Sequence, residues 1–299
     1  MHRRHLLAAA ILVTLATTLP AIAESPAMLT PSTSGLAPVN GVNIHYEVYG
    51  EGKPLILIHG GFGSIGMFSP ILPELAKGRQ VIGVDIQAHG GTGPLGRPMT
   101  FPAMATDIAE LITVLGFEKA DVMGYSLGGG VALRLAIDHP EVVEHLVLIS
   151  TAYAFDNWHD FNQHGMLGIA ANPDATAEGM KGSPMYQGYV AVAPGGADTW
   201  PAAVREVAAL VGQDFDWAAE LPSITAPTLV VVGDWDSIRI SKAAHLFELL
   251  GGGRQDAGWD RSGMNRNRFA VIPGATHYDI FMSPALPALV SPFIDQNRT

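Results

Sequence analysis

Short apolar runs alternate with stretches of helical periodicity along most of the chain. A strand that is buried on both faces appears as a continuous apolar run, and a helix between two such runs brings them side by side in parallel. The pattern therefore predicts an α/β fold with a mostly parallel, doubly wound sheet. The runs assigned to buried strands cover residues 55–58, 81–84, 120–123, 142–149, 228–232 and 269–272.

Helices are predicted between these runs. Apolar positions recur with helical spacing over residues 107–115, and Gly116 ends that pattern. Before the first buried strand, Asn40-Gly41 separates two strand-like segments, which is typical of a β-hairpin turn. Further helices are predicted over residues 71–77, 131–137 and 284–294.

The alternation stops between residues 151 and 221. This segment is rich in glycine, alanine, methionine and aromatic residues and contains no clear strand pattern. A loop of that length without secondary structure is uncommon inside a compact domain. We therefore predict a helical cap insertion over residues 151–221, with the core formed by residues 36–150 and 222–299.

The N-terminus has the layout of a secretory signal peptide over residues 1–23. A basic start is followed by an apolar stretch over residues 6–19 and by the small-residue cleavage site Ala21-Ile22-Ala23. That stretch is shorter than the roughly 20 residues that span a bilayer. We expect cleavage after Ala23, export to the periplasm or the medium by either the general or the twin-arginine route, and no membrane anchor afterwards. Residues 24–35, rich in Pro, Ser and Thr, are predicted to form a disordered lead-in.

Composition narrows the class of protein. A formal net charge of −11 disfavours nucleic acid and anionic membranes as partners, because their phosphates repel an acidic surface. Hydrophobic residues make up 48% of the chain and charged residues 15%, which is typical of a globular protein with a large core. The absence of cysteine excludes disulfides, thiolate metal sites and a cysteine nucleophile.

Gly124-Tyr125-Ser126-Leu127-Gly128 is a G-x-S-x-G pattern between an apolar run and a predicted helix. A serine hydroxyl needs exposure, a base and nearby backbone donors before it acts as a nucleophile. A sharp strand-to-helix turn exposes the hydroxyl, and the helix N-terminus points N–H groups toward developing negative charge. Ser126 is therefore a candidate nucleophile, provided that an acid and a histidine follow it.

Both partners follow later strands. Two carboxylates, Asp234 and Asp236, come directly after one predicted strand, and His277 comes after the next. Catalytic groups in open α/β sheets gather at the carboxyl ends of the strands, so these side chains can converge on Ser126. The histidine would take the serine proton, and the carboxylate would hold the histidine tautomer. Spacing alone leaves Asp234 and Asp236 as alternatives.

With these motifs in order, the sequence resembles the α/β-hydrolase superfamily, and most of all its cap-bearing esterase, lactonase and C–C hydrolase members. The order of the motifs is far more specific than any one of them. The resemblance covers most of the chain after the lead-in and rests on His59-Gly60-Gly61-Phe62, Asp85-Ile86-Gln87-Ala88-His89-Gly90, the serine pentapeptide, and Gly233-Asp234-Trp235-Asp236 with Thr276-His277.

The resemblance implies roles for individual side chains. It implies Ser126 as the nucleophile, His277 as the base and Asp236 as the acid of a triad. Asp234 would then be a loop carboxylate or a helix cap, and Asp279 would be structural. No cofactor and no bound metal are implied.

Backbone donors and pocket residues complete the candidate site. The resemblance implies an oxyanion hole made of the N–H groups of Gly61 and Leu127, with Phe62 as the alternative to Gly61. Methionine and aromatic residues of the cap suit an apolar, adaptable pocket, or they pack the cap onto the core. The residues expected to contact substrate are Phe62, Tyr125, Trp158 and Tyr186.

These residues predict a serine hydrolase that cleaves a small, apolar carboxylic ester through an acyl-enzyme. The same triad could serve C–C bond hydrolysis, lactone opening or perhydrolysis. Haloalkane dehalogenases, by contrast, carry an aspartate where this chain has Ser126. A non-catalytic binding protein on the same scaffold is an alternative from a different class.

A nucleotide-binding oxidoreductase is a further alternative. Residues 61–66 fit G-x-G-x-x-G after a strand, and Asp85 follows at a distance suited to a ribose-binding carboxylate. That interpretation leaves the later serine, acid and histidine unexplained, so we expect no nucleotide cofactor.

Four histidines outside the triad are expected to be structural. His59 and His89 would shape loops through hydrogen bonds. His139 and His145 are expected on the surface. The histidine spacing does not match a zinc-binding pattern, so no metal site is expected.

Overall fold

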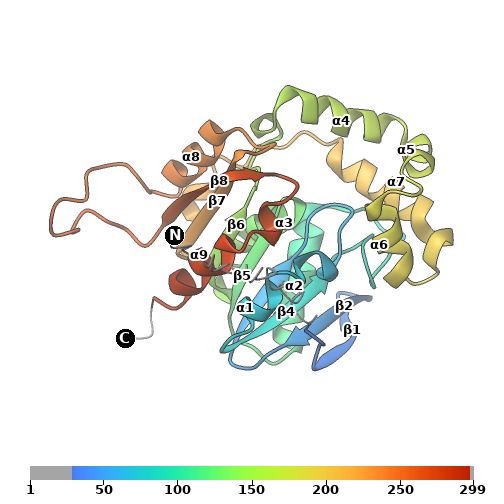
Figure 1. Ribbon diagram of the computed structural model, residues 1–299, viewed down its shortest axis with the longest axis horizontal. Helices are drawn as coiled ribbons and strands as arrows, with labels where there is room; N and C mark the ends of the chain where they lie inside the picture. Colours follow the sequence, from blue (N-terminus) through green and yellow to red (C-terminus); the bar gives the residue numbers. More distant parts are fainter. Residues whose placement is uncertain (1–28, 297–299) are drawn as a thin grey trace, which may run out of the picture.

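A computed structural model describes residues 29–296 of the protein (Figure 1). Within that range one eight-stranded sheet contains β1 (Thr33–Val39), β2 (Val42–Tyr49), β3 (Lys53–Ile58), β4 (Arg79–Asp85), β5 (Ala120–Tyr125), β6 (Val143–Ile149), β7 (Thr228–Trp235) and β8 (Arg268–Thr276). The spatial order is β1-β2-β4-β3-β5-β6-β7-β8. Pairing is antiparallel between β1 and β2 and between β2 and β4, and the remaining pairs are parallel. The predicted α/β fold with a mostly parallel sheet is confirmed.

Helices cover both faces of the sheet. Side chains alternate along a strand, so Ile56 and Ile58 of β3 belong to one buried cluster, and Leu55 and Leu57 belong to the other. The first cluster is covered by α2 (Phe101–Val114), α3 (Leu127–Asp138) and α8 (Ile240–Leu249). The second is covered by α1 (Leu72–Leu75) and α9 (Ala285–Ile294). No helix within residues 29–296 is long and apolar enough to cross a membrane.

Four more helices lie between β6 and β7, inside the predicted cap segment: α4 (Asp160–Ala171), α5 (Pro173–Gly179), α6 (Pro184–Val192) and α7 (Trp200–Val211). Figure 1 shows them together at one end of the molecule, away from α1 and α9. Helix α7 holds this cap on the core, because Trp200, Val204 and Val207 are buried. The α7 side chain Glu206 also accepts hydrogen bonds from Gln87 Nε2 at 2.8 Å and from the Gly96 N–H at 2.9 Å.

The predicted lead-in differs from the structure at its C-terminal end. The signal peptide of residues 1–23 and the lead-in up to residue 28 lie outside the described residues. Residues 33–35 already belong to β1, with Thr33 opposite Val48 of β2, so the expected disorder is wrong there. The composition is misleading because β1 is an edge strand, most of whose side chains face solvent. Helix α8 also has no counterpart in the prediction.

His145 is buried, and its expected place on the surface is wrong. It lies on β6, which is covered on both faces, so its side chain has no route to solvent. Its Nδ1 lies 2.7 Å from Asp121 Oδ1, and the buried Arg79 binds the other oxygen of that carboxylate. These contacts offset part of the cost of burying the three polar side chains, although Arg79 Nε and His145 Nε2 have no hydrogen-bond partner among the described residues.

Candidate active site

Ser126 sits at the sharp turn between β5 and α3. Its backbone has φ 54° and ψ −116°, a conformation that costs energy for a residue with a side chain. The Ser126 N–H donates to the Ile149 carbonyl at 2.9 Å, and the Ser126 carbonyl accepts from the Gly130 N–H at 3.0 Å. Neighbouring strand and helix therefore hold the strained turn, which presents the hydroxyl beyond the end of the strand.

The two glycines of the serine motif are required by close backbone packing. A Cβ atom on Gly124 would lie 2.3 Å from the Gly128 carbonyl oxygen. A Cβ on Gly128 would lie 2.3 Å from the carbonyl oxygen of His59 and 2.5 Å from that of Ile58. Helix α3 can therefore start directly against the loop after β3 only because both positions lack a side chain.

The structure brings Ser126, His277 and Asp236 into one chain of hydrogen bonds. Ser126 Oγ lies 3.0 Å from His277 Nε2, and His277 Nδ1 lies 2.8 Å from Asp236 Oδ1. With the Nδ1 proton donated to the carboxylate, Nε2 can accept the serine proton. The Asp236 side chain has no exposed surface and that of His277 is 7% exposed, so water competes little for these bonds.

The environment of Asp236 keeps its carboxylate ionised. Burial alone raises the pKa of this carboxyl, but the hydrogen bond and charge of His277 and the Ile238 N–H outweigh burial and lower the pKa below its ordinary value. The Ser150 hydroxyl also donates to Asp236 Oδ2, at 2.5 Å. Sequence reasoning missed Ser150; its place directly after β6, beside the strand end that carries the acid, is the signal that could have identified it.

The other two carboxylates near the triad stabilise turns. Asp234 Oδ1 accepts from the Gly274 N–H at 2.7 Å, across the pairing of β7 with β8. Asp279 Oδ1 accepts from the N–H and the hydroxyl of Thr276, at 2.7 and 2.9 Å. Both carboxylates therefore form hydrogen bonds within the loops that carry Asp236 and His277.

Two neighbouring backbone N–H groups without a hydrogen-bond partner within residues 29–296 are the candidates for an oxyanion hole. Leu127 is the first residue of α3, so its N–H lies outside the hydrogen-bond ladder of that helix. The Gly61 N–H has no acceptor among the described residues. A Cβ built on Gly61 would lie 3.5 Å from Leu127 Cδ1, so the two residues are neighbours. Their N–H groups can serve one oxygen if both face the carbonyl that Ser126 attacks.

The Phe62 N–H is already occupied, which removes the alternative donor. It donates to His89 Nε2 at 2.8 Å, and His89 Nδ1 in turn donates to the Gln87 carbonyl at 2.8 Å. Burial, together with the nearby His59, lowers the pKa of His89 to about 3, so its ring is neutral and Nε2 stays an acceptor. His89 therefore holds Phe62 at its positive φ of 55° and shapes the loop that carries Gly61.

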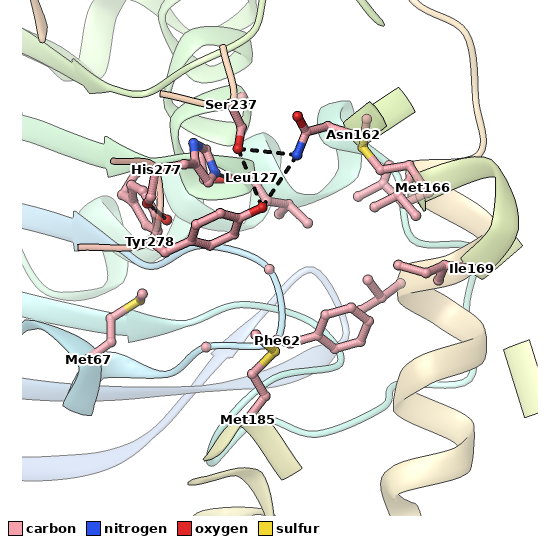
Figure 2. Close-up of a pocket in the computed structure, with 18 of the residues that line it drawn as sticks. Phe62, Met67, Leu127, Asn162, Met166, Ile169, Met185, Ser237, His277 and Tyr278 are labelled. Carbon is pink, nitrogen blue, oxygen red and sulfur yellow. Dashed lines mark hydrogen bonds between the residues drawn. The ribbon is translucent and has the colours of Figure 1, made fainter. Parts of the chain in front are cut away.

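An apolar cavity of about 890 Å³ opens beside the triad, between the core and the cap (Figure 2). The predicted contacts Phe62, Tyr125 and Trp158 line it, with Ser126 and His277. Tyr186 does not belong to the lining, so the cavity gives no support to its predicted contact with substrate. Side chains along a helix point to different sides, and that of Tyr186 packs against Trp200, with ring centroids 5.6 Å apart. From the cap, the lining includes Phe161, Met166, Met185 and Tyr189.

A small polar cluster stands in this apolar wall, and sequence reasoning missed it. Figure 2 shows Asn162 of α4 with Ser237 and Tyr278, close to His277. Asn162 Nδ2 donates to Ser237 Oγ at 3.2 Å and to the Tyr278 hydroxyl at 3.4 Å. Ser237 and Tyr278 directly follow Asp236 and His277 in the chain, which is the signal that could have identified them.

The carboxylate needed by the nucleotide-binding alternative is engaged inside the protein. Asp85 is buried and accepts hydrogen bonds from the N–H groups of Ile65 and Gly91, both at 2.8 Å. It also lies 2.8 Å from His45 Nδ1. Asp85 therefore stabilises the loops after β3 and β4. Its carboxylate is not free to bind the ribose of a nucleotide. Residues 29–296 contain no group of three or more His, Cys, Asp or Glu side chains arranged to hold a metal ion.

Residues 53–183 match the family model described as alpha/beta hydrolase fold. A soluble epoxide hydrolase of a Corynebacterium species is 38% identical over 125 residues, which cover 41% of this chain and 43% of that protein. A fluoroacetate dehalogenase of a Burkholderia species is 32% identical over 166 residues, which cover 48% of this chain and 55% of that protein. The chain thus spans about half the length of the curated relatives that it matches.

Solved structures resemble a larger part of the chain. A thermophilic esterase from Thermogutta terrifontis superposes with a TM-score of 0.69 at 22% identity, over 90% of this chain and 100% of the esterase. At that identity the likeness shows a shared fold, including the segment after residue 183 that the family model does not cover.

Proposed function

We propose that the chain is a serine hydrolase of the α/β-hydrolase fold superfamily, which cleaves a carboxylic ester through an acyl-enzyme; the family model over residues 53–183 and the shared fold support this. The observation that carries this proposal is the pair of hydrogen bonds made by His277. Its Nε2 lies 3.0 Å from Ser126 Oγ, and its Nδ1 lies 2.8 Å from Asp236 Oδ1. A nucleophile, a base and an acid in that order are what acyl transfer requires.

The proposed reaction begins with attack of Ser126 Oγ on the ester carbonyl carbon, while His277 Nε2 takes the hydroxyl proton. Asp236 stabilises the resulting imidazolium, and the N–H groups of Gly61 and Leu127 stabilise the oxyanion. The C–O bond to the alcohol breaks as His277 returns the proton to the leaving oxygen. Water, deprotonated by His277, then attacks the acyl-enzyme and releases the carboxylic acid.

A serine nucleophile favours carbonyl substrates over epoxides and halides. Attack of Ser126 on a saturated carbon would form an alkyl ether, which the same triad cannot hydrolyse. Attack on a carbonyl forms an ester, which activated water opens. The reactions named for the epoxide hydrolase and the fluoroacetate dehalogenase are therefore not the ones that we propose for this chain.

The cavity favours an uncharged substrate. No Asp, Glu, Lys or Arg occurs among the described residues that line it. A carboxylate substrate would lose its hydration there without gaining a cationic partner, which is costly. The volume of about 890 Å³ is near the upper end for small-molecule pockets, so it suits an ester with a sizeable apolar group.

A fluorophosphonate probe and p-nitrophenyl esters test the proposal directly. We expect the wild-type protein to be labelled and to hydrolyse p-nitrophenyl butyrate, and Ser126→Ala to lose both properties while keeping its circular dichroism spectrum. Ser64→Ala is the matched control, because Ser64 lines the same cavity but does not contact the histidine. Labelling that persists in Ser126→Ala would refute the proposed nucleophile, and a wild-type protein that is never labelled would favour a non-catalytic binding protein.

A neutral lactone is the second candidate substrate, since ring opening uses the same carbonyl attack and the same uncharged lining. C–C bond cleavage and perhydrolysis require a β-diketone and hydrogen peroxide, respectively. A panel of one alkyl ester, one lactone and one β-diketone, with and without peroxide, ranks these reactions by kcat/KM. Faster turnover of the β-diketone than of the ester would replace the ester assignment.

We also propose that the chain is exported and cleaved after Ala23. The basic, apolar and small-residue segments over residues 1–23 support this proposal. N-terminal sequencing of the mature protein from periplasm or medium is expected to start at Glu24. A protein that keeps Met1 and stays in the cytosol would contradict it.

A further inference from the structure

The polar cluster of Asn162, Ser237 and Tyr278 joins the cap to the core in the wall of the cavity (Figure 2). Asn162 belongs to α4, and its amide donates to both hydroxyls, at 3.2 and 3.4 Å. The Ser237 hydroxyl donates to the Tyr278 hydroxyl at 3.5 Å. Ser237 is buried, whereas Tyr278 is exposed.

The cluster has unused hydrogen-bonding capacity but no charge. The Tyr278 oxygen accepts from Asn162 and Ser237, so its own proton remains to be donated. No acceptor for that proton lies among residues 29–296. The hydroxyl oxygens offer acceptor sites at the same place. A neutral group that both donates and accepts, such as a hydroxyl, therefore matches the cluster.

The position of the cluster places it beside the leaving group of the proposed reaction. His277 must reach the leaving oxygen to return its proton, so the alcohol part of the ester extends past this ring. Tyr278 follows His277 directly, with the two ring centroids 5.7 Å apart. The apolar wall around Phe62 and Met185 lies away from the cluster in Figure 2, where an acyl chain can be held.

Resting on the proposed esterase function, we infer that the substrate is a neutral ester with an apolar acyl group and a hydroxyl-bearing alcohol. The second hydroxyl of a short diol or polyol donates to and accepts from the Tyr278–Ser237 pair, while the acyl group fills the apolar cavity. Asn162 acts as a positioning residue, because its amide orients both hydroxyls and ties them to α4.

Two esters of the same acid test whether the cluster recognises a hydroxyl group on the alcohol part. 2-Hydroxyethyl butyrate and propyl butyrate share the acyl group and nearly the same size, and differ in one terminal hydroxyl. Dividing each kcat/KM by the rate of hydroxide-catalysed hydrolysis removes the difference in intrinsic reactivity. We expect the wild-type protein to prefer the hydroxyethyl ester by about five- to tenfold, the effect of one neutral hydrogen bond.

Variants of the cluster connect that preference to its residues. Tyr278→Phe and Ser237→Ala are expected to reduce the ratio toward one, mainly through KM of the hydroxyethyl ester. Gln187→Leu is the control, because Gln187 lies on the exposed side of α6, outside the cavity lining. We expect this control to keep the wild-type ratio.

The possible failures can be told apart. Ser126-dependent hydrolysis of both esters with a corrected ratio near one overturns the inference and leaves the proposed function intact. A wild-type preference that survives unchanged in both cluster variants also overturns it, because the hydroxyl is then recognised elsewhere. Failure of the wild-type protein to hydrolyse either ester, or hydrolysis that persists in Ser126→Ala, overturns the proposed function with it.

Discussion

The Nδ1 atom of His277 lies 2.8 Å from Oδ1 of Asp236, although 41 positions separate the two residues in the chain. The two residues follow neighbouring parallel strands, β7 and β8, whose pairing shifts register between Gly233 and Trp235. Such an irregularity bends a strand and redirects the side chains after it. Asp236, rather than Asp234, therefore reaches the histidine.

Replacing this carboxylate should remove most of the proposed activity. In Asp236→Asn the amide can donate toward His277 and favour the tautomer that cannot accept the serine proton, so we expect kcat to fall by on the order of 10⁴. Ester hydrolysis by purified, folded variants measures the effect. Asp234→Asn is the control and should keep kcat within about threefold, since it disturbs only the contact to Gly274. The reverse ranking would assign the acid to Asp234.

The same carboxylate should couple stability to pH. The pKa of Asp236 in the folded protein is lower than its ordinary value of 3.8, so the unfolded chain binds the proton more tightly. Its contribution to stability is present above that ordinary value and is lost as pH falls through the lower folded pKa. We expect the acid-induced drop in Tm below about pH 5 to be smaller in Asp236→Asn than in the wild-type protein. Equal drops in calorimetric scans from pH 7 to pH 3 would contradict the lowered pKa.

The close packing at Gly128 predicts a large difference between two glycine substitutions. Gly128→Ala places a methyl group 2.3 Å from the His59 carbonyl oxygen, so α3 must shift. We expect a destabilisation of about 1–3 kcal/mol, as for other overpacked sites, together with loss of the proposed esterase activity. Urea unfolding measures the stability.

Gly168→Ala is the matched control for that substitution. Gly168 lies in α4, where an added Cβ meets nothing within 4 Å. Alanine there should stabilise the protein by about 0.5–1 kcal/mol, because glycine loses more backbone entropy in a helix. Similar destabilisation by both substitutions would refute the role of close packing at Gly128.

His89 should affect the proposed reaction without touching the substrate. His89→Ala removes the acceptor of the Phe62 N–H and loosens the loop that carries Gly61. Loss of a full oxyanion donor costs on the order of 10²–10³ in rate, so we expect a smaller effect of roughly tenfold on kcat, with KM little changed. His139→Ala, at the far end of α3, should leave kcat unchanged. An unchanged kcat in His89→Ala would show that the loop is held by other contacts.

The pattern of the sequence was enough to predict the sheet and to identify Ser126 and His277 as two residues of the proposed triad. Strands such as β3 and β6 are buried on both faces and therefore appear as continuous apolar runs. Ser126 and His277 could be located because each directly follows a strand, and strand ends meet at one edge of a parallel sheet. By contrast, the edge strand β1 was missed in part because its exposed side chains resemble those of a loop.

Only the tertiary structure decided which side chains meet around these residues. The register shift after Gly233 selected Asp236, and the orientation of α6 turned Tyr186 toward Trp200 and away from the cavity. The polar contact of Asn162 with Ser237 and Tyr278 joins the cap to two loops of the core. Sequence periodicity reports which face of an element is buried, whereas such contacts depend on how separate elements pack in space. The sequence therefore determined the fold and the candidate nucleophile, and the packing of cap on core decided the shape and polarity of the pocket.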